Sequence, residues 1–156
     1  MLDSVFQKVY TKFKLHFYRS VFGRFQNREA SLTAVETFCV EIIMALGHPT
    51  INEFSNFLQI SSPNAAYKIN SLIQKGYIVK KRSDEDKREY HLAVTQKYLD
   101  YYNVSYNYLS TVMGRIKERF PAEDVEKLVQ MLTIVSDELM PEIPVPSGAN
   151  WGRGIV

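Results

Sequence analysis

The chain has 156 residues, the size of one ordinary domain and enough to bury a core without a metal or disulfide staple. Its single cysteine excludes an intramolecular disulfide and favours a reducing compartment such as the cytoplasm, while the net charge of +2 is too small to indicate a partner. No apolar run approaches the roughly 20 residues that cross a bilayer, so we expect no membrane partner and no export signal.

Charge is unevenly distributed along the sequence. The segment 61–97 holds eight basic and four acidic residues, whereas the segment from 120 onward holds two basic and six acidic residues. The middle of the chain is therefore basic and the C-terminal part acidic, and such a distribution guides charged partners more than the net charge does.

Apolar residues at three- and four-residue spacing predict a helix over about 2–26 with an aromatic face. The residues of this face are Phe6, Val9, Tyr10, Phe13 and Phe17. Thr33 and Glu36 have the spacing of a capping box, which predicts a second helix through about Leu46.

The next two predicted helices are short and well delimited. Thr50 and Glu53 repeat the capping-box spacing and open a helix of about two turns. For the following helix we expect Ser62 as N-cap, Pro63 at the first helical position and Gly76 as the C-terminal stop. Its period places one set of residues inward, namely Ala65, Ala66, Ile69, Leu72 and Ile73, and another outward, namely Asn64, Tyr67, Lys68, Ser71 and Lys75.

After this helix the period changes to that of strands. The runs 77–82 and 89–95 are rich in β-branched and aromatic residues and flank the charged stretch "SDEDK", which predicts a β-hairpin. We expect Thr95 to cap a long tyrosine-rich helix that ends before Pro121, and a last apolar-striped helix over 122–139.

Two helices joined by a tight turn and followed by a hairpin are the order of a winged helix-turn-helix, whose second helix enters the major groove of DNA. We therefore expect a mainly α fold with a small β-hairpin wing, organised as a single domain, 1–156. The winged helix-turn-helix core covers about 33–97. N- and C-terminal dimerisation helices flank it at about 2–26 and 96–140, and the Pro- and Gly-rich tail, 141–156, is irregular.

The run "NEFSNFLQISSPNAAYKINSLIQKGYIVKKRSDEDKREYHLAVTQKY" resembles the MarR-type (multiple antibiotic resistance regulator) transcription factors. Its most specific parts are Leu72 to Ile78, Asp86 to Arg88 and Leu92 to Thr95. The resemblance implies a homodimeric, sequence-specific transcription regulator, a repressor, that binds a palindromic site on double-stranded DNA. It also implies release by a small-molecule effector.

The resemblance assigns roles in the wing. It places Arg88 at the wing tip in the minor groove, with Asp86 holding that arginine through a charge-assisted hydrogen bond. Lys87 stands where relatives usually have another arginine, so a charge is kept but the planar fork is lost.

The remaining DNA contacts are expected on the reading helix and near phosphates. Relatives often carry arginines on the reading helix that this chain lacks, so the operator sequence does not transfer. The groove-facing residues are expected to be Asn64, Tyr67, Lys68 and Ser71, and those near phosphates Ser61, Ser62 and Lys81.

Two features have alternative interpretations. The tyrosines Tyr98, Tyr101 and Tyr102 either line an effector pocket with aromatic walls or pack an interface. Cys39 is either an oxidation sensor or, as its apolar neighbours favour, a packed and inert thiol.

Other classes of function find less support. The histidines His16, His48 and His91 show no ligand spacing, so we expect no metal site and no cofactor. No nucleophile elbow, phosphate loop or carboxylate pair indicates an enzyme. The main alternative is a winged-helix protein-interaction module that does not bind DNA and associates through its aromatic helices.

Overall fold

The computed structural model describes residues 1–25, 32–102 and 104–143, and the side chains of these residues except 24, 25 and 101–106. The chain forms two compact units. One comprises Met1–Ser20 and Val104–Val145, and the other is built on Val21–Asn103, which contains the predicted core of about 33–97. The organisation as a single domain stays a prediction.

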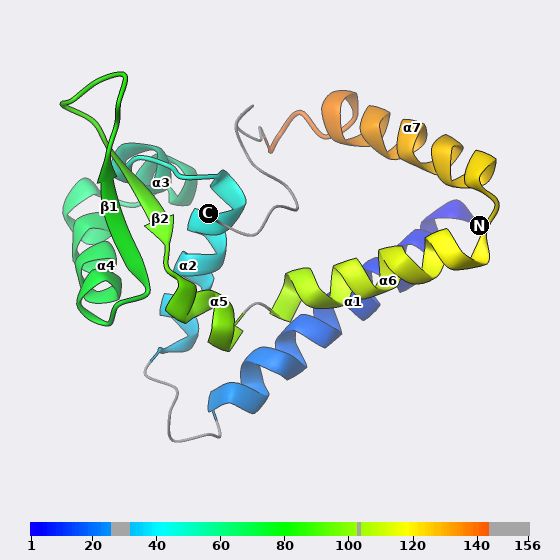
Figure 1. Cartoon of the computed structure of the whole chain (residues 1–156), viewed down its shortest axis with the longest axis horizontal. Helices are drawn as coiled ribbons and strands as arrows, with labels where there is room; N and C mark the ends of the chain where they lie inside the picture. Colours follow the sequence, from blue (N-terminus) through cyan, green and yellow to red (C-terminus); the bar gives the residue numbers. More distant parts are fainter. Residues whose placement is uncertain (26–31, 103, 144–156) are drawn as a thin grey trace. The chain divides into compact units, whose positions relative to one another are not determined.

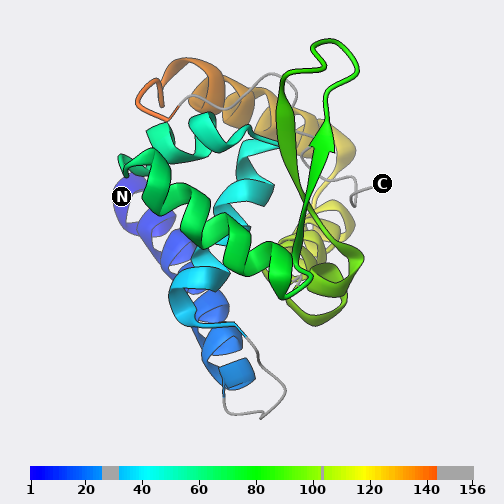
Figure 2. The same ribbon diagram turned by 90° about the vertical axis from the view of Figure 1, so that its left-hand side faces the viewer.

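The second unit contains the helix pair and hairpin that the sequence predicts. Its elements, labelled in Figure 1, are α2 (Ala34–Leu46), α3 (Ile51–Leu58), α4 (Ser62–Gln74), β1 (Ile78–Arg82), β2 (Tyr90–Val94) and α5 (Gln96–Tyr102). The strands pair antiparallel, from Ile78 opposite Val94 to Arg82 opposite Tyr90. Figures 1 and 2 both show the hairpin tip projecting beyond α3 and α4. The mainly α winged helix-turn-helix fold is confirmed.

Both predicted capping boxes are present. In α2, Thr33 Oγ1 accepts from the Glu36 backbone N–H at 3.2 Å, and Glu36 Oε2 accepts from the Thr33 N–H at 2.8 Å. Thr50 and Glu53 make the same two bonds at the start of α3, at 3.1 and 2.9 Å. Each box satisfies two amide donors that a helix start leaves free.

The start of α4 differs by one residue from the prediction. Ser61, not Ser62, is the N-cap, and its hydroxyl accepts from the Asn64 N–H at 3.3 Å. Pro63 consequently lies at the second helical position, where its missing N–H is also tolerated because the first turn has no intrahelical acceptor. Because two serines precede Pro63, either could serve as the N-cap, and the sequence pattern alone does not distinguish them.

The segment after α4 turns back on itself at Gly76, whose φ of 80° lies in the left-handed region that favours glycine. Thr95 directly precedes the next helix, and its carbonyl oxygen accepts from the Leu99 N–H at 3.3 Å. Its hydroxyl donates to the Gly76 carbonyl oxygen at 2.6 Å. The predicted long helix from Thr95 is described as α5 and α6 (Val104–Arg119), on either side of residue 103, which lies outside the described residues.

One hydrophobic core holds the second unit together. It includes Val40, Ile43, Phe54, Ile69, Leu72, Ile78, Leu92 and Tyr98. These residues come from α2, α3, α4, both strands and α5, and complete burial of such side chains contributes about 1.5–3 kcal/mol each. The turn before α3 also holds β2, because the Leu92 N–H donates to the Pro49 carbonyl oxygen at 2.8 Å. The core therefore fixes α4 and the hairpin against α2.

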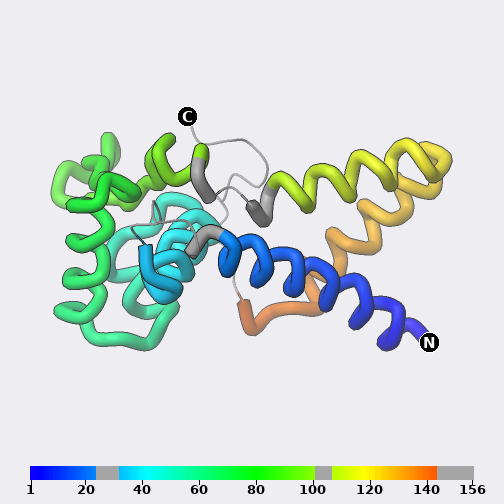
Figure 3. The backbone as a smooth tube through the Cα atoms, turned by 90° about the horizontal axis from the view of Figure 1, so that it is seen from below, coloured from blue at the N-terminus to red at the C-terminus, as the bar shows by residue number. Residues whose placement is uncertain are grey.

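The first unit contains the N-terminal part of α1 (Leu2–Phe25), α6 and α7 (Ala122–Glu138). The predicted first and last helices are thus present. Figure 3 shows the tight turn that joins α6 to α7. Tyr108 of α6 packs edge-on against Phe13 of α1 at 5.6 Å and stacks on His16 at 3.7 Å between ring centroids. Within the described residues, no helix is long and apolar enough to cross a membrane.

Candidate nucleic-acid interface

The N-terminal half of α4 presents polar side chains on its surface. Ser61, Ser62, Asn64 and Tyr67 are exposed, and Tyr67 has 76% of its surface accessible. Lys68 is half-buried. The first turn of α4 carries no acidic residue, so the positive end of the helix dipole is not neutralised there. Such a helix start suits both hydrogen bonding to base edges and approach to phosphates.

The wing is organised by bonds across its tip. The Ser83 N–H donates to the Glu89 carbonyl oxygen at 2.9 Å, and the Glu89 N–H donates to the Asp86 carbonyl oxygen at 3.0 Å. Arg82 donates its Nε–H to the Lys87 carbonyl oxygen. The tip therefore has a defined loop conformation that presents exposed Lys87 and Arg88.

Asp86 shapes the wing loop. Its carboxylate accepts from the backbone N–H of Arg88 at 2.9 Å, and the expected bond to the arginine side chain stays a prediction. An aspartate that bonds the amide two residues on forms an Asx turn, which shapes the loop without occupying the guanidinium. Asp86 therefore orients the Arg88 backbone. Lys81 lies on β1, exposed and opposite His91.

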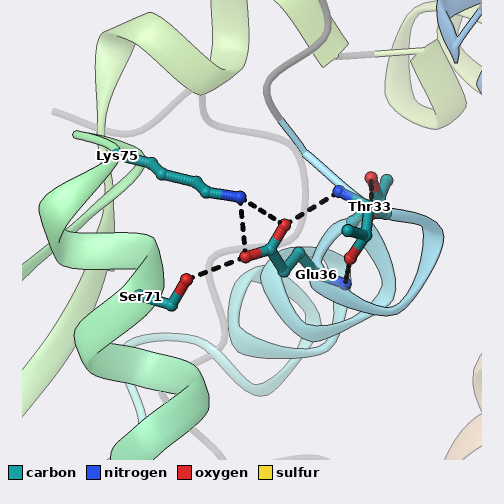
Figure 4. A network of polar contacts seen from close by, with 5 residues as sticks. Thr33, Glu36, Ser71 and Lys75 are labelled. Atoms are coloured by element: carbon teal, nitrogen blue, oxygen red, sulfur yellow. Dashed lines mark hydrogen bonds and ion pairs between the residues drawn. The ribbon is translucent and has the colours of Figure 1, made fainter.

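The C-terminal half of α4 is bound to α2 through a polar network, shown in Figure 4. Lys75 Nζ donates to Glu36 Oε1 and Oε2 at 2.9 and 2.8 Å, and Ser71 Oγ donates to Glu36 Oε1 at 2.9 Å. The structure thus directs the hydroxyl of Ser71, predicted to face the groove, toward α2. Burial opposes ionisation of Glu36, but bonds from Lys75, Thr33 and Ser71 and the charge of Lys75 outweigh it, lowering its pKa from 4.5 to about 2.

The predicted effector residues are only partly described. Tyr98 is fully buried in the core, its ring lies edge-on to Tyr77 at 6.2 Å, and its hydroxyl donates to Glu41. Burial raises the pKa of Glu41, and the bond from Tyr98 offsets part of that effect. The side chains of Tyr101 and Tyr102 lie outside the described residues. Tyr98 is thus a core residue here, and the effector pocket stays a prediction.

The environment of Cys39 matches a packed thiol. The residue is 4% exposed, and burial raises the pKa of its thiol, which opposes formation of a reactive thiolate. Within residues 1–25, 32–102 and 104–143, no group of three or more histidine, cysteine, aspartate or glutamate side chains is placed to hold a metal ion.

The first unit exposes apolar side chains on two helices. On α1 these include Phe6, Val9 and Tyr10, and on α7 they include Leu128, Val129 and Leu132, with Leu139 exposed directly after the helix. A cavity of about 210 Å³ between α1 and α6 is lined by Phe13, His16, Phe17, Tyr108 and Leu109. Exposed apolar stripes of this length are typical of surfaces that another chain covers.

The model of the MarR family matches residues 32–90, which run from just before α2 to the start of β2. The resemblance to the MarR family is confirmed. That match is to a family of transcription regulators, not of enzymes. A comparison with curated proteins found no match.

Solved structures of MarR-type proteins share the fold over most of the chain. Streptococcus pneumoniae FabT in complex with DNA is 20% identical, with a TM-score of 0.56, over 88% of this chain and 94% of that one. A MarR family protein from Bacillus stearothermophilus is 12% identical, with a TM-score of 0.58, over 88% and 92%. S. aureus MepR bound to ethidium bromide is 14% identical, with a TM-score of 0.55, over 89% and 96%. At these identities the likeness shows the fold.

Sequence reasoning missed two residues that shape this surface. In the sequence Arg82 stands out only as a basic residue, yet its Nε–H donates to the Lys87 carbonyl oxygen and so closes the loop at the wing tip. Glu36 was identified as a capping residue, but its bond to Lys75 joins positions 39 apart in sequence. The lack of any acid on the outward face of α4 gave a weak signal that Lys75 finds its partner on another helix.

Proposed function

We propose that this chain is a homodimeric transcription regulator that binds a palindromic DNA site through α4 and the wing. The observation that carries the proposal is the pairing of an exposed polar helix start with an ordered basic wing, in a segment that matches the MarR family. Asn64, Tyr67 and Lys68 would contact bases, Ser61, Ser62 and Lys81 would approach phosphates, and Lys87 and Arg88 would enter the minor groove. Asp86 would orient Arg88.

The dimer is proposed from the exposed apolar stripes of α1 and α7 in the first unit. A two-fold dimer would set two copies of α4 about one DNA turn apart, roughly 34 Å, which is why the site should be palindromic. Sedimentation velocity of the purified chain should give a dimer at micromolar concentration, and a monomer at that concentration would contradict this part of the proposal.

Repression and release by an effector follow from the family resemblance. MepR bound to ethidium bromide is a relative in which a small molecule occupies the protein. A ligand releases DNA only if its affinity differs between the DNA-binding and the free conformation. Screening aromatic compounds for a change in DNA affinity tests this step. If no compound changes the affinity, regulation by the abundance of the protein or by a protein partner is favoured instead.

Fluorescence anisotropy on DNA from the region upstream of the protein's own coding sequence tests the DNA-binding proposal. Binding should weaken steeply with salt, because phosphate contacts release counterions. Arg88→Ala should lower the affinity about tenfold or more. Arg115→Ala, which removes the same charge from an exposed position on α6, should leave it nearly unchanged. Equal effects of the two variants would contradict the role of the wing.

A further inference from the structure

The C-terminal end of α4, the proposed reading helix, is bound to α2 through the carboxylate of Glu36, which accepts hydrogen bonds from both helices. Glu36 caps its own helix through the Thr33 N–H at 2.8 Å, and the same carboxylate accepts both bonds from Lys75. Figure 4 shows these contacts converging on one side chain, with Ser71 joining from the preceding turn of α4. The side chains of Lys75 and Glu36 are 32% and 15% exposed, so the ion pair is partly removed from water.

The same end of α4 is also tied to α5. Lys97 Nζ donates to the Lys75 carbonyl oxygen at 2.8 Å, and its ammonium lies 4.5 Å from the centre of the Tyr77 ring. The Thr95 hydroxyl holds the next carbonyl, that of Gly76. The last turn of α4 is therefore bound by side chains from the first turns of both α2 and α5.

Capping alone does not require this arrangement. Glu53 completes an equivalent capping box in α3, where it exchanges hydrogen bonds with the backbone N–H and the hydroxyl of Thr50. Lys75 lies in the basic middle of the chain, where a lysine would ordinarily be read as a phosphate contact. To reach a phosphate, however, its ammonium would have to give up two short bonds to a carboxylate that is itself bonded to Thr33 and Ser71.

We propose that Glu36 and Lys75 are positioning residues that fix the orientation of α4 relative to α2 and α5. They thereby determine how well the protein discriminates between DNA sequences. Lys75 does not supply affinity for phosphates. The inference rests on the proposed function and deepens it, because a helix that tilts about a loose C-terminal end moves the base-reading residues at its other end. Phosphate contacts made by mobile lysines tolerate such a tilt better than bidentate base contacts do.

The test compares three variants on two DNAs, a selected specific site and an unrelated duplex of equal length, across a salt series. Lys75→Met keeps the aliphatic stem but removes the ammonium, Lys75→Arg keeps the cation, and Glu36→Gln keeps an oxygen acceptor for Thr33 but removes the charge. Glu53→Gln is the matched capping-box control. Circular dichroism at the assay temperature confirms that each variant is folded.

Lys75→Met should weaken binding to the specific site about tenfold while leaving the unrelated duplex and the salt slope unchanged. Lys75→Arg should bind as wild type, Glu53→Gln should also bind as wild type, and the double variant Glu36→Gln/Lys75→Met should bind little more weakly than Lys75→Met alone. A uniform loss on both duplexes with a salt slope reduced by about 1 would make Lys75 a phosphate contact and overturn the inference. Unchanged binding in all variants would overturn it too.

The same measurements distinguish failure of the proposed function from failure of this inference. If the wild-type chain binds neither duplex at low salt, the proposed function fails and this inference fails with it. If the wild type binds and discriminates but Lys75→Met loses both duplexes equally, only the inference fails.

Discussion

Replacing Glu36 by glutamine should destabilise the protein in a pH-dependent manner. The lowering of the Glu36 pKa from 4.5 to about 2 is equivalent to roughly 3 kcal/mol of folding free energy. The side chain of its partner Lys75 is 32% exposed, so solvent screening reduces the expected loss to about 1–2 kcal/mol at pH 7. Glutamine still offers an oxygen to the Thr33 N–H, so the loss reports the charge and not the cap.

The sign of the pH dependence follows from the direction of the pKa change. An acid whose pKa is lower in the folded state stabilises the protein above its unfolded value and loses that contribution as pH falls toward the folded value. The difference between wild type and Glu36→Gln should therefore be full at pH 7 and shrink from pH 4.5 toward 2.

Urea unfolding followed by far-ultraviolet circular dichroism measures this difference at several pH values. Glu53→Gln is the control, because it removes the same charge from an equivalent capping box, in which Glu53 bonds with Thr50 of its own helix start. A loss in Glu36→Gln no larger than in the control at pH 7, or a loss that persists undiminished at pH 3, would refute the reasoning.

Three further outcomes are expected. Glu41→Gln should gain stability relative to wild type as pH rises above 4.5 in urea unfolding, because burial raises the Glu41 pKa and its ionisation costs folding free energy; a constant difference would contradict this. Gly76→Ala should lower the free energy of unfolding by about 1 kcal/mol, measured by urea unfolding, because φ is 80°, although the nearest atom to the added carbon, Lys97 Cδ, is an ordinary 3.7 Å away. Cys39 should react with a thiol reagent only upon unfolding, and reaction of the folded protein at the rate of a free thiol would contradict its burial.

Local sequence signals predicted the elements well because they act over a few residues. The capping boxes of Thr33 and Thr50 depend on a partner three positions away, and both form. Gly76 ends the α4 segment with the positive φ that glycine favours. Where two neighbouring residues can both act as N-cap, as with Ser61 and Ser62, the local signal does not determine at which residue the helix begins.

Longer-range contacts could not be predicted from the pattern. Glu36 meets Lys75 across 39 positions and Glu41 meets Tyr98 across 57, and each pairing requires the packed core to bring the helices together. The sequence predicts a bond between the side chains of Asp86 and Arg88, and the structure shows the Asp86 carboxylate accepting from the Arg88 backbone amide, a contact set by the loop conformation. The assignment of DNA-contacting residues from charge and spacing therefore stays a prediction, while the orientation of their side chains depends on tertiary packing.

Selection of bound sequences from a pool of random duplex DNA tests the central claim most directly. The account predicts enrichment of a two-fold symmetric sequence whose half-sites lie about one helical turn apart, roughly 10 base pairs. Asn64→Ala and Tyr67→Ala should relax the preference at particular positions within each half-site. Recovery of unenriched DNA with the wild-type chain at low salt would contradict sequence-specific binding and favour a winged-helix module that serves protein partners.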